Sequence, residues 1–282
     1  MLSDRTYSRR KLKNSNTVSE FFGRIFLQQK LNNWFGWLLI AGIAIAFGYF
    51  ISIQTVFGLS LFGAIVGIFV IIGCLISTEL GLYINLTYSF FAFMFSRYLF
   101  HDEFPVGMVT DLLILATFLS ILFTDVKLKK LINGFIKTPV VICILILLFY
   151  LLLEFFNPYA HSVEGWFQTF RRFLGSVFLL FISYSVFTSH EKIKRFIVVL
   201  FALCVVAGLY GCIQQWHGLF GFELAWVHSD PVKFGLFYIM GDYRKFSTMS
   251  DPTAFGVAMA STAIFFMIYA WYQKSLTTKL IF

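Results

Sequence analysis

The sequence from residue 241 to residue 272 reads GDYRKFSTMS DPTAFGVAMA STAIFFMIYA WY. Its first half is polar, with two adjacent cations and several hydroxyl side chains, and its second half is an apolar run long enough to cross a membrane. Asp251 can act as the N-cap of a helix, and Pro252 suits the first helical position, where a missing N–H costs nothing. The stretch therefore predicts a membrane-spanning helix that begins at Asp251 and Pro252.

The start of this helix also has the composition of an anion-binding site. Free backbone N–H groups and the positive end of the helix dipole lie beside Arg244, Lys245 and Ser250 in the sequence. The alternative is an ordinary capped helix whose cations contact lipid head groups. The choice between them depends on the side of the membrane that the stretch faces.

The composition is that of a membrane protein. Hydrophobic residues make up 59% of the 282 residues, charged residues 13%, and the mean hydropathy is +0.81; a soluble domain carries about 25% charged residues. The net charge of +8 comes mostly from short basic clusters between apolar runs, which indicates membrane orientation rather than nucleic-acid binding. The four cysteines lie inside apolar runs without metal-ligand spacing. We expect an all-α membrane protein that uses no metal or other cofactor.

The chain divides into two predicted parts. Residues 1–33 are rich in Lys and Arg and form a cytoplasmic segment; a capping box at Thr17–Glu20 opens either a short amphipathic helix in the membrane interface or a plain lead-in to the first span. Residues 34–282 form the transmembrane helical domain. Its eight apolar runs predict a bundle of about eight spans, near residues 34–53, 56–76, 82–99, 106–124, 139–156, 172–188, 196–214 and 252–272.

The Lys and Arg residues predict the orientation of these spans. With the N-terminus inside and eight alternating spans, 16 of the 22 Lys and Arg residues lie in inner segments. The inverted arrangement would put those 16 outside, against the positive-inside rule. We therefore expect both termini to face the cytoplasm and the stretch 241–256 to face out. The outer cations are Arg97, Arg171, Arg172, Lys233, Arg244 and Lys245.

Three further features of the outer side suggest functional residues. The loop 215–251 is the longest and carries scattered aromatic residues, which suit either a lid or sugar-stacking surface or an ordinary interfacial belt. Asp111 lies inside a predicted span, and we expect it to pair with Arg97 across the hairpin. Arg171 and Arg172 precede the sixth span and could bind phosphate, either of a lipid or of a diphosphate substrate.

Three stretches resemble the N-terminal part of the bacterial O-antigen ligase and O-antigen polymerase family of polytopic membrane glycosyltransferases. One is Phe104-Pro-Val-Gly-Met-Val-Thr-Asp111, and another is Asn157-Pro158 followed by Trp166 and Arg171-Arg172. The third is Tyr243-Arg-Lys-Phe-Ser-Thr-Met-Ser-Asp-Pro-Thr-Ala-Phe-Gly256, which is similar to the family's Arg and Asp-Pro-Asn helix entry with Thr253 in place of Asn. The resemblance covers about residues 34–275.

The resemblance implies transfer of a glycan from a polyprenyl-diphosphate carrier to an acceptor hydroxyl at the outer face of the bacterial inner membrane, without metal or nucleotide. The family pattern implies that Arg244 binds the carrier diphosphate. We extend this role to Lys245 and Ser250, to Asp251 as the helix cap, and more weakly to Arg171 and Arg172. The expected partners are the lipid-linked glycan, its acceptor and membrane lipids, and no nucleic acid.

One departure from the family limits this expectation. Family members continue through further spans and a large outer loop that carries a catalytic His, so we expect this sequence to lack the family's C-terminal half. His217 and His228 lie on the outer side, but their positions do not match the family's His, and we assign no catalytic residue. The alternatives are a transporter or permease for an anionic solute and a non-catalytic membrane bundle.

Overall fold

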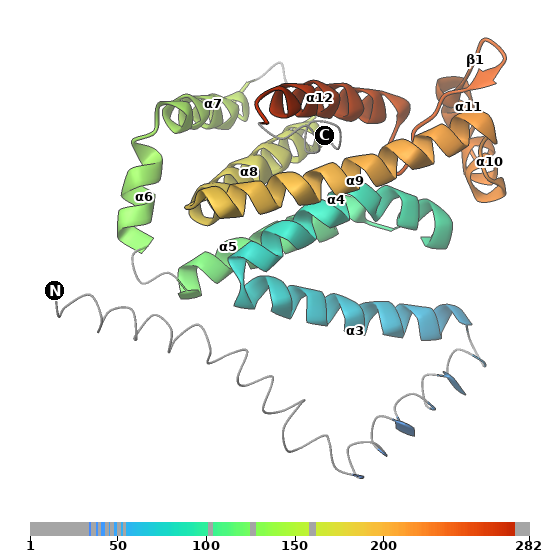
Figure 1. Cartoon of the computed structure of the whole chain (residues 1–282), viewed down its shortest axis with the longest axis horizontal. Coiled ribbons are helices and arrows are strands. Elements are labelled where there is room, and N and C mark those ends of the chain that lie inside the picture. Colours follow the sequence, from blue (N-terminus) through green and yellow to red (C-terminus); the bar gives the residue numbers. More distant parts are fainter. Residues whose placement is uncertain are drawn as a thin grey trace. The chain divides into compact units, whose positions relative to one another are not determined.

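The computed structural model describes residues 55–100, 104–124, 128–157 and 162–273, together with isolated helical positions between 34 and 52. The described chain is almost entirely helical (Figure 1), so the predicted all-α class is confirmed. The elements are α3 (Thr55–Ile76), α4 (Thr78–Phe100), α5 (Val106–Thr124), α6 (Leu128–Ile136), α7 (Pro139–Glu154), α8 (Val163–Val186), α9 (His190–Trp216), α10 (Gly221–His228), α11 (Pro231–Phe237), the strands β1 (Tyr238–Ile239) and β2 (Asp242–Tyr243), and α12 (Pro252–Trp271).

The chain divides into two compact units, Met1–Ile72 and Gly73–Phe282. Most of α3 belongs to the first unit, and α4 to α12 belong to the second, which contains all the predicted site residues. The predicted cytoplasmic segment 1–33 and most of the first predicted span, 34–53, lie outside the described residues.

Four of the described helices, α5, α8, α9 and α12, are long and apolar enough to cross a membrane. A fifth crossing is added if α6 and α7 form one span, but the two helices meet at an angle of 81°. These helices suggest a membrane protein. The count of eight spans and the cytoplasmic placement of both termini remain predictions.

Helix α4 is not among those four helices, and its polar side chains explain why. The buried Asn85 donates through Nδ2 to the Gly81 carbonyl (2.8 Å) and to Thr117 Oγ1 of α5 (3.0 Å). In an apolar environment a polar side chain must find its partners inside the protein. The polar side chains that lower the hydropathy of α4 therefore form the hydrogen bonds that join it to α5.

The α4–α5 contact gives a stability prediction at Gly81. A Cβ at this position would lie 2.5 Å from Thr117 Oγ1 and 2.6 Å from Thr117 Cγ2. Gly81→Ala should therefore separate the helices and lower the free energy of unfolding by about 1–3 kcal/mol. Thermal unfolding in detergent measures this loss. Gly256→Ala in α12 is the matched control, since nothing lies within 4 Å of its Cβ, and equal midpoints for both variants would contradict the close approach.

Helix α8 begins at Val163, nine residues before the start of the apolar run 172–188 from which the span was predicted. Ser162 accepts a hydrogen bond from the Gly165 N–H (3.0 Å) and caps the helix, so Arg171 and Arg172 lie inside α8 rather than before it. Its apolar side packs against α4, α5, α6 and α7, where Phe181 and Ile182 join Ile114 of α5 in one buried cluster. Helix α6 is amphipathic, with Lys129 and Lys130 exposed and Phe135 buried.

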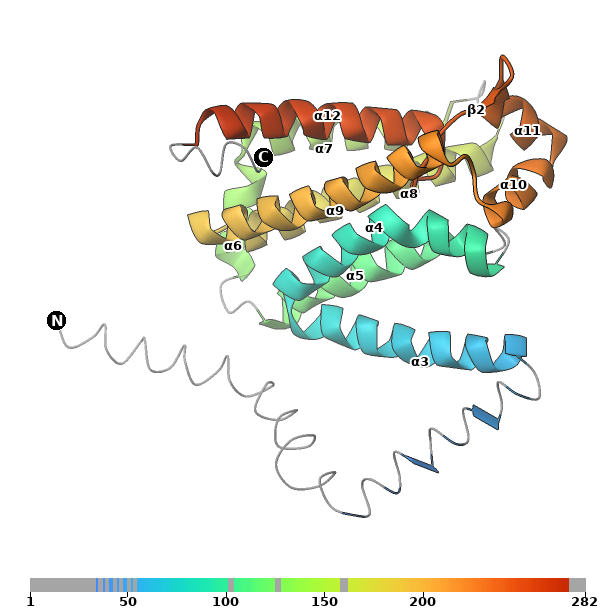
Figure 2. The ribbon, with the colours of Figure 1, turned by 45° about the vertical axis from the view of Figure 1, so that its right-hand side comes forward.

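Helices α9 and α12 lie side by side (Figures 1 and 2). They approach closely at Gly211, where a Cβ would lie 2.5 Å from Cζ of Phe255. Cys204 and Ala207 of α9 form a buried cluster with Phe266 of α12 and Phe90 of α4. This packing places the start of α12 beside the C-terminal end of α9, where α10, α11 and the hairpin also gather (Figure 1).

Candidate functional site

The predicted outer loop 215–251 is folded into α10, α11 and the β1–β2 hairpin. Met240 and Gly241 link the two strands, and both have positive φ (54° and 87°), as a two-residue hairpin turn of type I′ requires. Trp226, Phe237 and Phe246 pack edge to face and tilted in a small buried core. Two of the aromatic residues considered for a stacking surface, Trp226 and Phe237, are therefore buried, whereas Trp216 is 83% exposed.

The segment from residue 246 to residue 249 is fixed by Arg97 of α4. Arg97 is only 3% exposed, and its guanidinium donates through Nη1 to the Met249 carbonyl (2.8 Å) and through Nη2 to the Ser247 carbonyl (3.0 Å). The same guanidinium lies 4.4 Å from the ring centre of Phe246 and 5.1 Å from that of Trp226. Hydrogen bonds from a charged donor are stronger than those between neutral groups, and a cation–π contact is strengthened by burial. Both kinds of contact therefore hold the 246–249 segment against α4.

The expected pair of Arg97 with Asp111 is therefore wrong. Arg97 lies at the last turn of α4 and reaches the 246–249 segment, 150 residues away in the chain. Asp111 instead pairs with Arg171 of α8, with 3.2 Å between Oδ2 and Nε. Asp111 pairs with Arg171 because α5 packs against α8 as well as against α4, and the order of the spans in the sequence does not indicate the contact with α8.

Two more buried side chains hold the same segment from the side of α9 and α10. Gln214 Oε1 accepts hydrogen bonds from the N–H groups of Phe246 (3.2 Å) and Ser247 (2.7 Å), and its Nε2 donates to Glu223 Oε1 (2.7 Å). The Glu223 carboxylate also accepts from the Tyr210 hydroxyl and from the Phe220 N–H, both at 2.9 Å. Glu223 and Gln214 are fully buried, so this network sets a single position for the backbone.

Ser247 adopts a left-handed conformation with φ of 51°, which is unusual for a residue other than Gly. Its hydroxyl donates to the Ala207 carbonyl of α9 at 2.6 Å. The conformation persists because Arg97 of α4 and both Gln214 and Ala207 of α9 contact the residue, which is how strained backbone is retained in folded proteins. The 246–249 segment thus joins α4, α9 and α12 in a fixed arrangement.

Helix α12 begins as the sequence predicted. Asp251 has an extended backbone, its Oδ1 accepts from the Ala254 N–H (2.9 Å), and Pro252 occupies the first turn. Ser250 donates its hydroxyl to Asp251 Oδ2 (2.8 Å). The hydrogen bond from the Ala254 backbone is the largest of the effects that lower the pKa of Asp251 below its ordinary value. Ser250 and Asp251 therefore stabilise the helix start, and the nearby charge of Arg244 also contributes to the lowered pKa of Asp251.

The cap gives a pH-dependent prediction. The folded state lowers the pKa of Asp251, so its stabilisation is complete above the unfolded-state pKa of about 4 and is lost as the pH falls through the folded-state pKa. Asp251→Ala should lower the free energy of unfolding by about 1 kcal/mol at pH 7. The measurement is thermal unfolding of wild type and variant at pH 7 and pH 3. The difference should shrink at pH 3, and a constant difference would contradict the role of the carboxylate.

Arg244 and Lys245 line a shallow hollow of about 500 Å³ between the end of α9, the hairpin and the start of α12. Its lining residues are Gln215, Ile239, Met240, Asp242, Tyr243, Arg244, Lys245 and Pro252. The Lys245 ammonium is 3.0 Å from both oxygens of Asp242 and lowers the pKa of that carboxyl. Arg244 is exposed and makes no ion pair within 4 Å in the part of the chain that the structure describes.

Arg244 is nevertheless held by its backbone. Its N–H donates to the Phe237 carbonyl at 2.8 Å, and the fixed 246–249 segment begins two residues later. Tyr243 lines the same hollow, and its hydroxyl is 2.9 Å from His228 Nε2. The hollow therefore presents an exposed guanidinium and a paired ammonium on a rigid backbone.

Arg171 and Arg172 are not among the residues that line this hollow. Arg171 forms an ion pair with Asp111, and Arg172 is exposed on α8. Of the predicted phosphate-binding residues, the hollow is thus lined by Arg244 and Lys245, whereas Ser250 and Asp251 cap the adjacent α12 without lining the hollow. Within the described residues there is also no group of three or more His, Cys, Asp and Glu residues that could hold a metal ion.

Comparison with known proteins does not identify a family. No family model matches the chain. No curated protein and no solved structure matches it either. The resemblance to the O-antigen ligase family therefore rests on the sequence stretches alone, and the chemistry of the hollow has to be argued from its own residues.

Proposed function

We propose that the chain binds the diphosphate of a polyprenyl-linked glycan at Arg244 and Lys245 and takes part in transfer of that glycan to an acceptor hydroxyl at the membrane surface. The observation that carries the proposal is the exposed Arg244. It lies in a hollow beside a helix long and apolar enough to cross a membrane, and it has no acidic partner within 4 Å among the described residues. The phosphate site is argued from this geometry, and the reaction class from the sequence resemblance.

The charges of the hollow suit a phosphate ligand. A guanidinium binds phosphate oxygens through two parallel N–H groups and remains charged in any environment. Lys245 adds a second cation, although Asp242 partly neutralises it. Because the backbone of 244–251 is already fixed, binding does not require the loop to be ordered first, which lowers the entropic cost of association.

The same arrangement would assist glycan transfer. When the bond between sugar and diphosphate breaks, the departing diphosphate gains negative charge, and a preorganised cation stabilises that charge. The bond that forms joins the sugar to the acceptor oxygen, and the proton of the acceptor hydroxyl is released. Among the residues lining the hollow, Tyr243 is hydrogen bonded to an imidazole, but we assign no residue to this proton transfer.

The test is glycan transfer by the protein expressed from its natural gene, with polyprenyl-diphosphate glycan and acceptor supplied in membranes. Arg244→Ala should lower the transfer rate at least about 100-fold, since loss of one charge-stabilising donor costs that much in comparable sites. Lys233→Ala is the matched control, because Lys233 lies over the Trp226 ring at 4.8 Å and does not line the hollow. Normal transfer by Arg244→Ala, at equal protein level, would refute the proposed role.

The transporter alternative has one structural feature in its favour, the 81° break between α6 and α7. A helix broken inside the membrane is typical of transporters. The exposed Lys129 and Lys130 on amphipathic α6, however, suit a helix that lies in the membrane interface. Accumulation of an anionic solute in proteoliposomes, absent from empty vesicles, would favour transport over transfer.

A further inference from the structure

The helices of the second unit, Gly73–Phe282, define two ends. Thr78 Oγ1 lies 3.2 Å from Ser120 Oγ, so the start of α4 meets the last turns of α5. Phe187, which follows α8, and Phe196, near the start of α9, pack against the same buried cluster as Phe135 of α6. One end of the unit therefore contains α6 and the starts of α4 and α9, and Figure 2 shows the hairpin at the other end.

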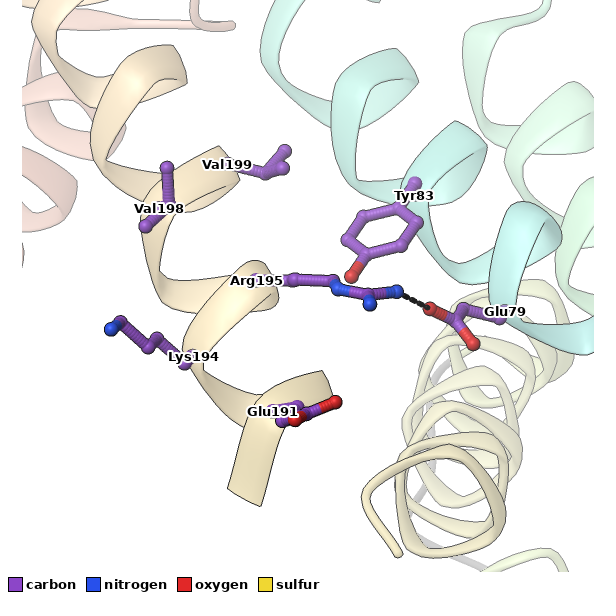
Figure 3. Close-up of a pocket in the computed structure, with 7 residues that line it drawn as sticks. All are labelled: Glu79, Tyr83, Glu191, Lys194, Arg195, Val198 and Val199. Carbon is purple, nitrogen blue, oxygen red and sulfur yellow. Dashed lines mark ion pairs between the residues drawn. The ribbon is translucent and has the colours of Figure 1, made fainter. Parts of the chain in front are cut away.

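The end that contains α6 carries a surplus of positive charge. Its described charged side chains are Lys129, Lys130, Lys137, Lys192, Lys194, Arg195, Glu79 and Glu191. Figure 3 shows Arg195 of α9 extending toward Glu79 of α4, with 4.0 Å between Nη1 and Oε1. Lys192 Nζ lies 3.4 Å from the same carboxylate. Because two cations share the single charge of Glu79, the start of α9 leaves no acid to neutralise the three lysines at α6.

Helix α6 has an apolar face and a basic face. The apolar face packs against the buried cluster of α5 and α8 and consists of Leu128, Leu131, Ile132 and Phe135. The other face exposes Lys129, Lys130 and Asn133, and the exposed Lys137 follows in the turn before α7. The stretch 128–137 contains no acidic residue, and none of its lysines makes an ion pair with a residue that the structure describes. Three ammonium groups therefore remain for an anionic ligand.

The bend between α6 and α7 places the basic face along the membrane surface. Helix α7 runs antiparallel to α8, because Val141 near its start shares a buried cluster with Phe181, and Leu151 near its end accepts a hydrogen bond from Trp166 Nε1 at 2.7 Å. Helix α8 is long and apolar enough to cross a membrane, so α7 has the direction of a crossing helix. Since α6 meets α7 at 81°, α6 lies nearly parallel to the membrane surface.

We propose that α6 is an interfacial helix that binds anionic phospholipid headgroups through Lys129, Lys130 and Lys137. A basic helix face at the membrane surface attracts anionic lipids. A phosphatidylglycerol headgroup brings only negative charge to the three ammonium groups. A phosphatidylcholine headgroup also brings a quaternary ammonium, and α6 has no carboxylate to receive it. The proposal is independent of the function proposed for the Arg244 hollow.

The test measures lipid retention by the full chain, purified in detergent and titrated with phosphatidylglycerol or phosphatidylcholine, by native mass spectrometry. Wild type should retain phosphatidylglycerol at least about fivefold better, which is the contribution of one Lys beside anionic lipid. Combining Lys129→Gln, Lys130→Gln and Lys137→Gln should lower phosphatidylglycerol retention by at least about fivefold and leave phosphatidylcholine retention unchanged.

Two controls separate charge from other changes in α6. Combining Lys129→Arg, Lys130→Arg and Lys137→Arg retains the charges and should retain the wild-type preference. Asn133→Ala alters the same exposed face without a change of charge and should also retain it. All four side chains are exposed, so their substitution removes no core contact. Thermal unfolding without added lipid should give equal midpoints, and if the triple Gln variant does not fold, Lys130→Gln alone should still lower phosphatidylglycerol retention.

Three results would overturn the proposal. One is equal retention of the two lipids by wild type. Another is unchanged phosphatidylglycerol retention in the folded Gln variants. The third is complete displacement of phosphatidylglycerol by inorganic phosphate, because the lysines would then bind a free anion rather than a lipid at the membrane surface.

Discussion

Arg97→Ala should lower the free energy of unfolding by about 3 kcal/mol, which is the largest loss of stability that we expect from any of the proposed substitutions. The change leaves the carbonyls of Ser247 and Met249 without their donors in a buried site, and hydrogen bonds to a charged group contribute about 1.5–3 kcal/mol each. It also removes the cation that lies against the rings of Phe246 and Trp226. Thermal unfolding of the purified chain in detergent measures the effect.

Two further variants make the Arg97 prediction specific. Arg97→Lys retains the charge but cannot donate to both carbonyls in a planar fork, so we expect it to recover less than half of the lost stability. Arg172→Ala, at an exposed Arg of α8, should change stability by less than about 0.5 kcal/mol. A small effect of Arg97→Ala, equal to that of Arg172→Ala, would mean that the 246–249 segment is held by other contacts.

Glu223→Gln should lower the free energy of unfolding by about 2 kcal/mol. One amide oxygen can replace one carboxylate oxygen, but the amide NH₂ would then face a donor, either the Phe220 N–H or the donors from Tyr210 and Gln214. A buried donor left without an acceptor costs about 1–3 kcal/mol. The measurement is the same unfolding assay. Glu164→Gln is the control for an exposed acid, and a Glu223→Gln variant as stable as this control would contradict the network.

The sequence predicted the helical class because its apolar runs are long and its composition is far from that of a soluble domain. It also predicted the start of α12, since Asp-Pro is a local signal and the cap is formed by residues three positions apart. The bounds of α8 were missed because Ser162 starts the helix before the apolar run begins. The count of spans depends on helices such as α4, in which Asn85 lowers the hydropathy while it bonds to α5.

The candidate site was predicted only in part, for a physical reason. Arg244, Lys245, Ser250 and Asp251 are neighbours in sequence, so a local pattern could group them. Arg97, Gln214 and Glu223 hold the same segment from distant helices, and their partners are backbone carbonyls, backbone N–H groups and one another. A polar side chain at the end of an apolar run was the available signal, but it does not say which loop the side chain reaches.

The measurement that tests the central claim most directly is binding of a polyprenyl diphosphate to the purified chain in detergent, followed by native mass spectrometry across a lipid titration. Our account predicts that wild type and Lys233→Ala bind equally, and that Arg244→Ala binds at least about tenfold more weakly, since loss of a charge-assisted contact of about 1.4 kcal/mol has that effect. The unphosphorylated polyprenol should not compete. Equal binding by Arg244→Ala and wild type, or full competition by the polyprenol, would contradict the claim that the Arg244 hollow binds the diphosphate.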